Sequence, residues 1–380
     1  MADLKTNPHQ LTNTTANIQD IYASLEQEIF KLIANRLSWK GLTVDNVMTW
    51  QMQKLSELHL LNVDTIKLLA EATGLAETVI GELFVGQGLK VYDESMSMVK
   101  RGRSKVNGIS NIDQVLKGYA DQTFKEIKNT VNQTLISTNY GDKSIVTDMY
   151  QQIIKETTGS VIAGFKTPER AVADTIYKWR DKGIGPVMVD KGGHNWSLEG
   201  YTRTVVNTTS NRAFQNVRDT VAHENNLHTF VMSSHSACRE ACAPIQGKLV
   251  TDRQQSFDDP KTGEHFESLY NHGYGEPGGT FGINCSHIKW PYISGVNTNN
   301  QPQFDEQDAI ANGQAKQKQR ALERRIREEK RKLALAQEMN DDAGIEKYSL
   351  TVKKYQSAMR THLKAYKGIL GREYQREKVY

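Results

Sequence analysis

Apolar residues recur at spacings of three and four over most of the chain, which is the pattern of amphipathic helices. Within residues 17–37 this spacing predicts one continuous apolar face, made of Ile18, Tyr22, Leu25, Ile29, Ile33 and Leu37. Shorter helices are predicted from Val47 to Leu58, from Asp64 to Ala72, and from Leu75 to Val85. Gly74 should end the second of these, because glycine is a common helix stop. Together these segments predict an N-terminal helical region over residues 1–99.

Residues 100–108 are polar and contain glycine, so we place a loop there. Helical spacing resumes from Ile112 through Val131 and from Ile145 through Ile154. A further helix should begin at Pro168 and end at Gly183, because proline suits the first turn of a helix. These elements predict a second helical region over residues 100–184.

The pattern changes after residue 185. A short strand and a turn are expected first, and Ser197 can then cap the helix that follows. Thr229–Met232 is predicted to form a strand, and the next stretch lacks helical spacing and is rich in Gly, Asp, His and Cys. Five glycines between Gly273 and Gly282 require tight turns or a close backbone approach. We therefore expect a compact α+β unit over residues 185–300.

The last part of the chain is predicted to be an antiparallel helical hairpin over residues 301–380. A long, strongly charged helix should begin near Asp305, and a polar break follows at residues 340–342. The second helix has a sustained apolar stripe, made of Ile345, Tyr348, Val352, Tyr355, Met359, Leu363, Tyr366 and Leu370. The fold class predicted for the whole chain is mainly α with a small α+β domain.

Composition narrows the class of protein. The chain has 380 residues, of which 38% are hydrophobic and 24% charged, so it can bury real cores in two or three compact units. No apolar stretch approaches the roughly 18 residues needed to cross a bilayer, so no membrane partner is expected. The first residues lack the features of a secretory signal. The three cysteines are an odd number clustered among histidines, which favours a reducing compartment and synthesis in the cytosol.

Charge is distributed unevenly along the chain. Residues 313–380 hold 18 Lys/Arg against 9 Asp/Glu, whereas the whole chain has a net charge of only +4. Such a concentration of positive charge indicates nucleic acid or an acidic protein surface as a partner of the tail. A solvated helical face explains it equally well. The candidate nucleic-acid contacts are Lys316, Lys318, Arg320, Arg324, Arg325, Arg327, Lys330, Arg331 and Lys332. On the helix after Ser197, exposed charge is the expected state of Arg203, Arg212 and Arg218.

Five potential zinc ligands lie within about fifty residues of one another, namely His235, Cys238, Cys242, Cys285 and His287. Thiolate sulfur and imidazole nitrogen are the ligands that zinc prefers in tetrahedral sites. The spacing matches none of the strong zinc-finger patterns, so three interpretations stay open: a structural metal, unliganded buried thiols, and a catalytic thiol.

The catalytic interpretation requires a histidine base and an oxyanion donor near the thiol. Cys285 and His287 do not settle this geometry, because side chains two residues apart in a strand point to opposite faces. His265 and His272 are other possible bases, but nothing in the sequence marks either one. The sequence contains no P-loop, no His-Glu-x-x-His and no Gly-x-Ser-x-Gly motif.

Three segments resemble the phage minor capsid protein 2 family, which is similar in turn to the head morphogenesis proteins like the F protein of phage Mu. They are NWSLEGYTRTVVNTTSN (195–211), SSHSACREACAPIQGKLV (233–250) and YGEPGGTFGINCSHIKWPYISGV (274–296). The helical opening and the ends of the tail are similar in style, so the resemblance spans most of the chain. The family pattern falls on His235, Arg239, Cys242, Gln246, Gly247, Lys248, Asn284, Cys285 and His287.

The resemblance implies a low-copy virion protein of the phage head, synthesised in the host cytoplasm and located at the portal region or on the capsid interior. Its partner would be the portal protein or the major capsid protein. It implies a role in head assembly and DNA delivery and brings no established enzymatic activity. Cys238 stands where the family usually has a small residue, which makes His235, Cys242, Cys285 and His287 the preferred ligands of a structural zinc, with Cys238 as substitute. A thiol- or metal-dependent hydrolase of the head and a DNA-binding regulator are the competing hypotheses.

Overall fold

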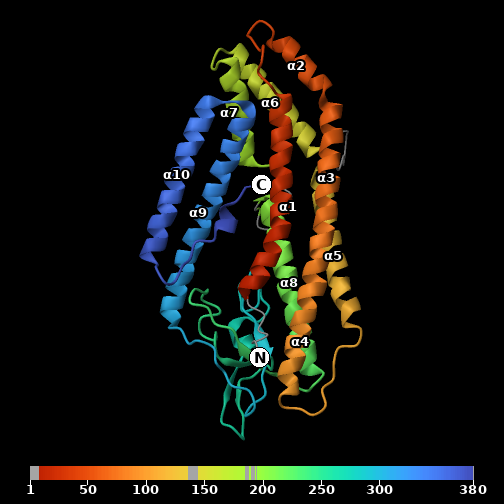
Figure 1. Cartoon of the computed structure of the whole chain (residues 1–380), viewed down its shortest axis with the longest axis vertical. Helices are drawn as coiled ribbons and strands as arrows, with labels where there is room; N and C mark the ends of the chain where they lie inside the picture. The colour runs from red at the N-terminus through yellow and green to blue at the C-terminus, as the bar shows by residue number, and fades with distance from the viewer. Residues whose placement is uncertain (1–7, 136–143, 185–187, 190–192, 194, 380) are drawn as a thin grey trace.

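The computed structural model describes residues 8–135, 144–184, 188–189, 193 and 195–379. The protein is an elongated helical body with a small α+β unit at one end and a helical hairpin along one side (Figure 1). This confirms the predicted fold class, mainly α with a small α+β region. Among the described residues, no helix combines the length and the apolar character that crossing a membrane requires.

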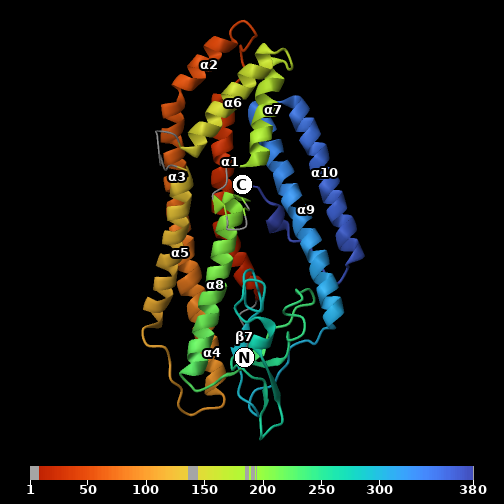
Figure 2. The same ribbon diagram turned by 180° about the vertical axis from the view of Figure 1, so that it is seen from behind.

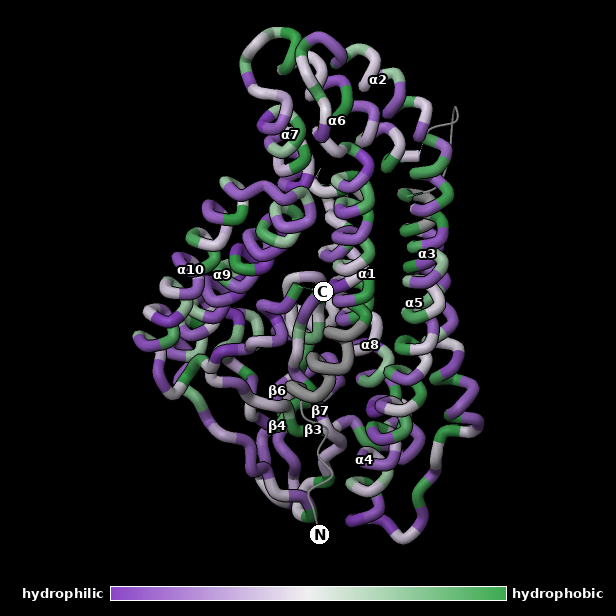
Figure 3. The backbone as a smooth tube through the Cα atoms, turned by 45° about the horizontal axis from the view of Figure 1, so that its top comes forward, coloured by the Kyte–Doolittle hydropathy of each residue, from purple (hydrophilic) through white to green (hydrophobic). Residues whose placement is uncertain are grey.

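The long helices lie side by side and bury one face each. α1 (Pro8–Arg36) packs against α3 (Leu58–Gly81) and α8 (Leu198–His223). Viewed from behind, α8 lies beside α5 (Ile112–Leu135) and α4 (Gly88–Lys100) (Figure 2). Hydrophobic and hydrophilic residues alternate along these helices (Figure 3), as the sequence pattern predicts. Their apolar faces form one large core, in which Ile18, Ile29, Phe30, Phe84, Ile154, Ile176 and Phe214 are all nearly or fully buried.

The prediction that Gly74 ends a helix is wrong. Residues 64–81 lie within a single helix, α3, which also includes Leu75. The apolar face continues past the glycine through Ala76 and Ile80, so burial outweighs the roughly 1 kcal/mol that a mid-helix glycine costs. α3 then passes into η1, a π-helical segment over Glu82–Gln87, and on into α4.

The remaining helices of the body begin where the local signals place them. α2 (Val47–Ser56) precedes α3, and α6 (Ile145–Ile162) precedes α7 (Pro168–Lys182). The Thr167 side chain accepts a hydrogen bond from the backbone of α7, Pro168 occupies its first turn, and Gly183 follows its end with a φ of 74°. Ser197 caps α8 in the same way. A two-stranded sheet, β1 (Met188–Val189) with β2 (Asn195–Trp196), lies just before α8.

The α+β unit is built on a five-stranded mixed sheet in the order β5-β6-β4-β3-β7. Its strands are β3 (Thr229–Met232), β4 (Leu249–Thr251), β5 (Phe257–Asp258), β6 (His265–Ser268) and β7 (Lys289–Pro291), and the short 3-10 helix η2 covers Leu269–His272. β4 and β6 are parallel, and the other neighbours are antiparallel. The predicted strand at Thr229–Met232 is thereby confirmed, and it lies between β4 and β7 in the sheet.

The glycine-rich loop of this unit closes on itself. A Cβ atom on Gly279 would lie 1.9 Å from the carbonyl oxygen of Gly273, and one on Gly282 would lie 1.9 Å from that of Glu276. Only residues without a side chain can occupy these two positions, which is the close backbone approach that the sequence predicts.

The C-terminal hairpin consists of α9 (Glu306–Met339) and α10 (Asp342–Ala365), joined by a turn at residues 340–341. The expected helical stripe is too long, because α10 ends at Ala365 and leaves Tyr366 and Leu370 beyond it. The chain turns back there through positive-φ Gly368 and reaches η3 (Tyr374–Glu377), which packs against α9.

The start of α9 is seated against the α+β unit. A Cβ atom on Gly313 would lie 2.1 Å from the carbonyl oxygen of Cys238, so the helix approaches this backbone as closely as a glycine allows. The Cys238 backbone N–H donates to the Ala309 carbonyl at 3.0 Å, and the Asn312 side chain donates to the Ser236 carbonyl at 3.0 Å. The hairpin and the α+β unit are therefore in direct contact at this end of α9.

Candidate metal centre

Two segments far apart in sequence meet at the end of the strand pair formed by β3 and β7. β3 and β7 are antiparallel, with Met232 opposite Lys289. Beyond β3, the Ser233 backbone N–H donates to the Ile288 carbonyl at 2.7 Å, and the Ile288 N–H donates to the Ser233 hydroxyl at 2.9 Å. These bonds extend the pairing and bring the residues after β3 next to those before β7.

Three of the predicted ligands converge at this place. Cys242, Cys285 and His287 are all buried, and their ligand atoms lie within 4.8 Å of one another. The Sγ atoms of Cys242 and Cys285 are 3.9 Å apart, and Cys285 Sγ is 3.6 Å from His287 Nδ1. Tetrahedral zinc, with bonds of about 2.3 Å to sulfur and about 2.0 Å to nitrogen, separates such ligands by about 3.8 Å and about 3.5 Å. The spacing of these donor atoms fits a zinc ion.

Cys285 and His287 do not lie in a strand, so their side chains need not point to opposite faces. Both precede β7, in a turn and loop where side chains do not alternate between two faces. Asn284, just before them, has a φ of 57°, and this left-handed residue redirects the chain. Two residues apart, the cysteine and the histidine therefore point to the same centre.

His235, the fourth predicted ligand, lies beside the other three without joining them. Its ring packs edge-on against the ring of His287 with centroids 4.5 Å apart, and its Nε2 is 3.4 Å from the Ser233 hydroxyl. Gln246 connects the two histidines, because its Oε1 accepts from the His235 backbone N–H at 2.9 Å and lies 3.5 Å from His287 Nε2. Gln246 therefore faces the Nε2 side of the His287 ring and can orient it so that Nδ1 points to the cysteines.

The electrostatics of the cluster favour ligand-competent groups. A hydrogen bond from the Cys242 thiol and the nearby His287 hold the pKa of Cys285 well below its ordinary value, although burial opposes this. The same hydrogen bond raises the pKa of Cys242. Burial, followed by the neighbouring His287, lowers the pKa of His235 to about 4, so His235 is neutral at pH 7. The shared hydrogen bond therefore favours ionisation of Cys285 over that of Cys242, and neutral His235 can offer a ring nitrogen to a metal.

Surrounding side chains fix the backbone of this cluster. On α8, the Asn211 amide donates to the Cys285 carbonyl at 2.8 Å, and the Gln215 amide donates to the His287 carbonyl at 3.1 Å. The Arg239 guanidinium donates to the carbonyls of Gly279 and Ile283 at 3.0 and 3.2 Å, which holds the glycine-rich loop against the Cys242 segment. The cluster is therefore braced from two sides.

Cys238, the substitute ligand, lies in a different environment. It packs in a small apolar cluster with Ala243 and Ala309, and burial raises the pKa of its thiol to about 11. It is not one of the three residues whose ligand atoms converge.

A second group of potential ligands was missed by the sequence reasoning. His223, His228 and Asp252 come together at the end of α8 and beside β4, with His228 Nδ1 2.9 Å from Asp252 Oδ1 and His223 Nε2 in contact with the other carboxylate oxygen. Both histidines are well exposed. The spacing of these residues in the sequence did not predict the group. Asp252 follows β4, and it is the pairing of β4 with β3 that brings it next to the two histidines.

Cys285 also borders a small cavity of about 180 Å³ that Asn211, Asp219 and Tyr274 line. This arrangement places the sulfur of Cys285, the ring of His287 and the cavity side by side. The Cys285 side chain is nevertheless only 6% exposed.

Most of the basic residues predicted to contact nucleic acid make contacts within the protein. Arg327 and Arg331 share the carboxylate of Glu199 on α8, at 2.7 and 2.8 Å. Five of the nine are engaged in ion pairs or hydrogen bonds: Arg320, Arg327, Lys330, Arg331 and Lys332. The other four have no ion pair or hydrogen bond to a described residue: Lys316, Lys318, Arg324 and Arg325.

The expectation that the arginines of α8 are exposed is correct only for Arg212. Arg218 is 2% exposed and lies 3.8 Å from the carboxylate of Glu94 on α4, so it joins two helices inside the core. Arg203 is half-buried and lines the large cavity described below.

Comparison with known proteins gives consistent results. The phage minor capsid protein 2 family matches residues 6–364. A structural protein of Lactococcus phage LL-H is 35% identical over 371 residues, which cover 95% of this chain and 98% of that protein. A structural protein of Lactococcus phage mv4 is 39% identical over 121 residues, which cover 32% of this chain and 98% of that protein. No solved structure matches.

Proposed function

Because this chain belongs to the phage minor capsid protein 2 family, a virion protein family, we propose that it is a low-copy protein of the phage head that binds the portal protein or the major capsid protein. The observation that carries the proposal is the extent of the likeness, which runs through the helical body, the α+β unit and the hairpin. The role is structural, in head assembly and in the packaging or delivery of DNA.

An exposed apolar end supports docking onto another head protein. Met48 and Met52 stand one turn apart on α2 and are 56% and 72% exposed. Phe165, in the turn between α6 and α7, is 83% exposed at the same end of the molecule, opposite the α+β unit (Figure 1). Methionine and aromatic side chains are enriched in protein interfaces, and methionine adapts readily to a partner's shape.

The test has two parts. Quantitative mass spectrometry of purified particles should find the chain at far fewer copies than the major capsid protein. The double substitution Met52→Lys with Phe165→Lys should reduce its incorporation at least tenfold without changing its melting temperature. Leu350→Lys is the matched control, because Leu350 is similarly exposed, at 59%, but belongs to α10 and not to α2 or the turn between α6 and α7. Abundant free protein with none in particles contradicts the proposal.

We also infer that Cys242, Cys285 and His287 hold a structural zinc, with His235 or a water molecule as the fourth ligand. When bound, zinc would cross-link the segment after β3 to the segment before β7. The fit of the three donor atoms to tetrahedral spacing supports this.

A thiol hydrolase is the second candidate, favoured by the 3.6 Å contact of Cys285 with His287 beside the 180 Å³ cavity. We consider it weaker, because the Cys285 thiol is buried. Stoichiometric trapping of Cys285 by an acyl or peptide electrophile at pH 7, in zinc-loaded protein, would establish the hydrolase instead.

A further inference from the structure

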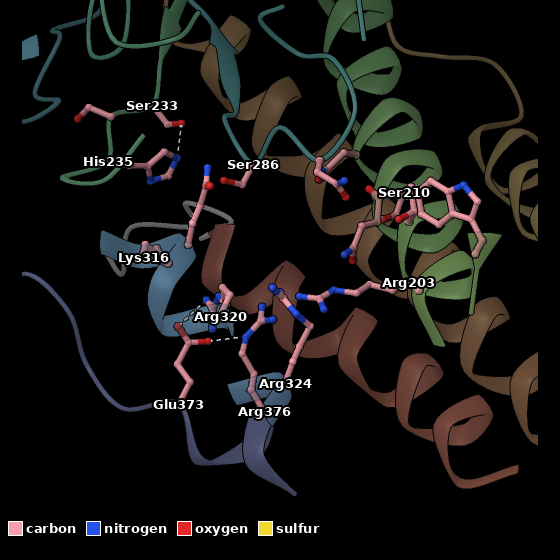
Figure 4. Close-up of a pocket in the computed structure, with 18 of the residues that line it drawn as sticks. Arg203, Ser210, Ser233, His235, Ser286, Lys316, Arg320, Arg324, Glu373 and Arg376 are labelled. Atoms are coloured by element: carbon pink, nitrogen blue, oxygen red, sulfur yellow. Dashed lines mark hydrogen bonds and ion pairs between the residues drawn. The ribbon is translucent and has the colours of Figure 1, made fainter. Parts of the chain in front are cut away.

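A large cavity separates the hairpin from the rest of the molecule near the α+β unit. It has a volume of about 1070 Å³ and is bounded by α8, the first half of α9, the segment around η3 and the loops beside β3 and β7 (Figure 4). Pockets for small ligands commonly measure about 300–1000 Å³, so this space can hold several charged groups. Sequence reasoning did not find it, because its walls come from four distant parts of the chain.

The walls carry an excess of positive charge, although Arg320 is already paired with both Glu323 and Glu373. Five basic side chains line the cavity, namely Arg203, Lys316, Arg320, Arg324 and Arg376, and Glu373 is the single carboxylate among its described lining residues. Glu373 is shared, because it receives Arg320 at 2.7 Å and Arg376 at 2.8 Å. Figure 4 shows the guanidinium groups of Arg203, Arg324 and Arg376 directed toward one another.

Three of these cations lack a partner in the part of the chain that the structure describes. Arg203, Lys316 and Arg324 make no ion pair or hydrogen bond with a described residue, although all three line the cavity. Burial and then the neighbouring Arg376 lower the pKa of Arg203 to about 10. Burial and then Arg320 lower the pKa of Arg376. Bringing these charges together therefore costs free energy, and a bound anion would offset that cost.

Neutral donors complete the lining. The Ser234 hydroxyl and the indole nitrogen of Trp290 are buried and have no hydrogen-bond partner among the described residues, and both residues border the cavity. Ser286 and Asn284 also line the cavity. Buried donors without partners are uncommon, so their presence beside a cluster of cations points to an anionic ligand that accepts hydrogen bonds.

We propose that this cavity is a binding site for a ligand bearing several phosphate groups, held by Arg203, Lys316, Arg320, Arg324 and Arg376. Arginine binds phosphate oxygens through paired hydrogen bonds, and a cluster of five cations matches several phosphates better than one carboxylate. The phosphates belong either to a free polyphosphate or nucleotide or to the backbone of a nucleic-acid strand. The proposal is independent of the docking role proposed above.

The experiment uses the full chain and inorganic tripolyphosphate as the first probe. Isothermal titration at fixed ionic strength should show saturable binding by the wild type, and thermal unfolding should show stabilisation beyond that given by sodium chloride. Arg203→Gln and Arg324→Gln should each raise the Kd about tenfold. Arg325→Gln is the matched control, because Arg325 is the exposed neighbour of Arg324 and does not line the cavity.

A second readout separates binding from folding. Without phosphate, Arg203→Gln and Arg324→Gln should melt at or above the wild-type temperature, because each removes one repelling charge. An ATP arm and an oligothymidine arm identify the source: tighter binding of ATP indicates a small molecule, and tighter binding of the oligonucleotide indicates a nucleic-acid strand. Equal tripolyphosphate affinity in the wild type and both cavity variants, or stabilisation no greater than that by sodium chloride, would overturn the proposal.

Discussion

Tyr177 on α7 donates its hydroxyl hydrogen to Oδ2 of Asp341 at 2.7 Å, and so joins the helical body to the turn of the C-terminal hairpin. Asp341 is 1% exposed and also receives Arg170 at 2.7 Å on its other oxygen. The same side chain caps α10 by accepting from the Gly344 backbone N–H at 3.1 Å. One buried carboxylate therefore holds α7 and the start of α10 together.

Replacing Asp341 by Asn should destabilise the protein by about 1.5–3 kcal/mol at pH 7, the range for hydrogen bonds to a charged group. Burial opposes ionisation, but hydrogen bonds from Tyr177 and Arg170 keep the pKa of Asp341 below its ordinary value. Because the pKa of Asp341 is lower in the folded than in the unfolded protein, its carboxylate stabilises the fold at pH values above the unfolded pKa of about 3.9. This stabilisation is lost as the pH falls through the folded pKa. Thermal melts from pH 7 to pH 3 should therefore show the gap between wild type and variant closing below about pH 4.

The control for this measurement is Asp342→Asn, because Asp342 is the exposed neighbour in the first turn of α10. It should melt within about 0.5 kcal/mol of wild type at every pH. A gap for Asp341→Asn that is as wide at pH 3 as at pH 7 would show that its carboxylate charge contributes nothing.

Gly279→Ala should destabilise the α+β unit by about 2–4 kcal/mol, because the new methyl group would collide with the Gly273 carbonyl and only a backbone shift can relieve it. Limited proteolysis of residues 251–282 and a thermal melt measure the effect. Gly278→Ala is the matched control, since nothing lies within 4 Å of a Cβ atom there. Equal protease resistance of the two variants would show that the loop is loosely packed.

Elemental analysis of the purified protein should find about one zinc per chain, because the proposed tetrahedral site holds a single ion. Cys285→Ser should lose the metal and expose residues 251–282 to protease, while the helical body stays folded. Cys238→Ala should keep the metal, because Cys238 lies among alanines away from the other thiols. Metal-free protein with a protease-resistant α+β unit would mean that Cys242 and Cys285 are ordinary buried thiols.

DNA should bind the full chain weakly and without sequence preference. If all nine basic residues of α9 met phosphates, log K against log salt would have a slope of about −8, whereas four unengaged charges give about −4. Fluorescence anisotropy with duplex DNA over a range of salt concentrations measures this slope. A slope near −8 would mean that Glu199 releases Arg327 and Arg331 on binding, and a flat response would assign the charge to protein contacts.

Local signals were enough to predict most of the helical fold. The cap at Thr167 and the proline after it fix the start of α7, and Ser197 does the same for α8. The break before Asp342 separates α9 from α10 because both sides have their own apolar spacing. These features depend on neighbours within a few residues, which a sequence pattern contains directly.

Features that depend on distant contacts could not be predicted. Gly74 continues a helix because α3 packs against α1 and α5, and no residue beside the glycine reveals this. Lys289 has an ordinary surface character in sequence, yet it is fully buried, with Nζ 2.8 Å from Asp219 on α8 and 2.6 Å from the Tyr274 hydroxyl. Candidate ligands could be named by residue type, but only the pairing of β3 with β7 selects which of them meet.

Helix α9 is held by contacts near both of its ends, so its length fixes the distance between those two contacts. One end is held where Gly313 rests on the Cys238 carbonyl, and the other where Asp341 meets Tyr177. Inserting one residue between them would rotate one anchor by about 100° relative to the other, so both could not engage. Inserting seven would restore the orientation but push the hairpin turn about 10 Å along the axis. The stretch of chain between these two contacts therefore fixes the distance between the sheet and the far end of the body.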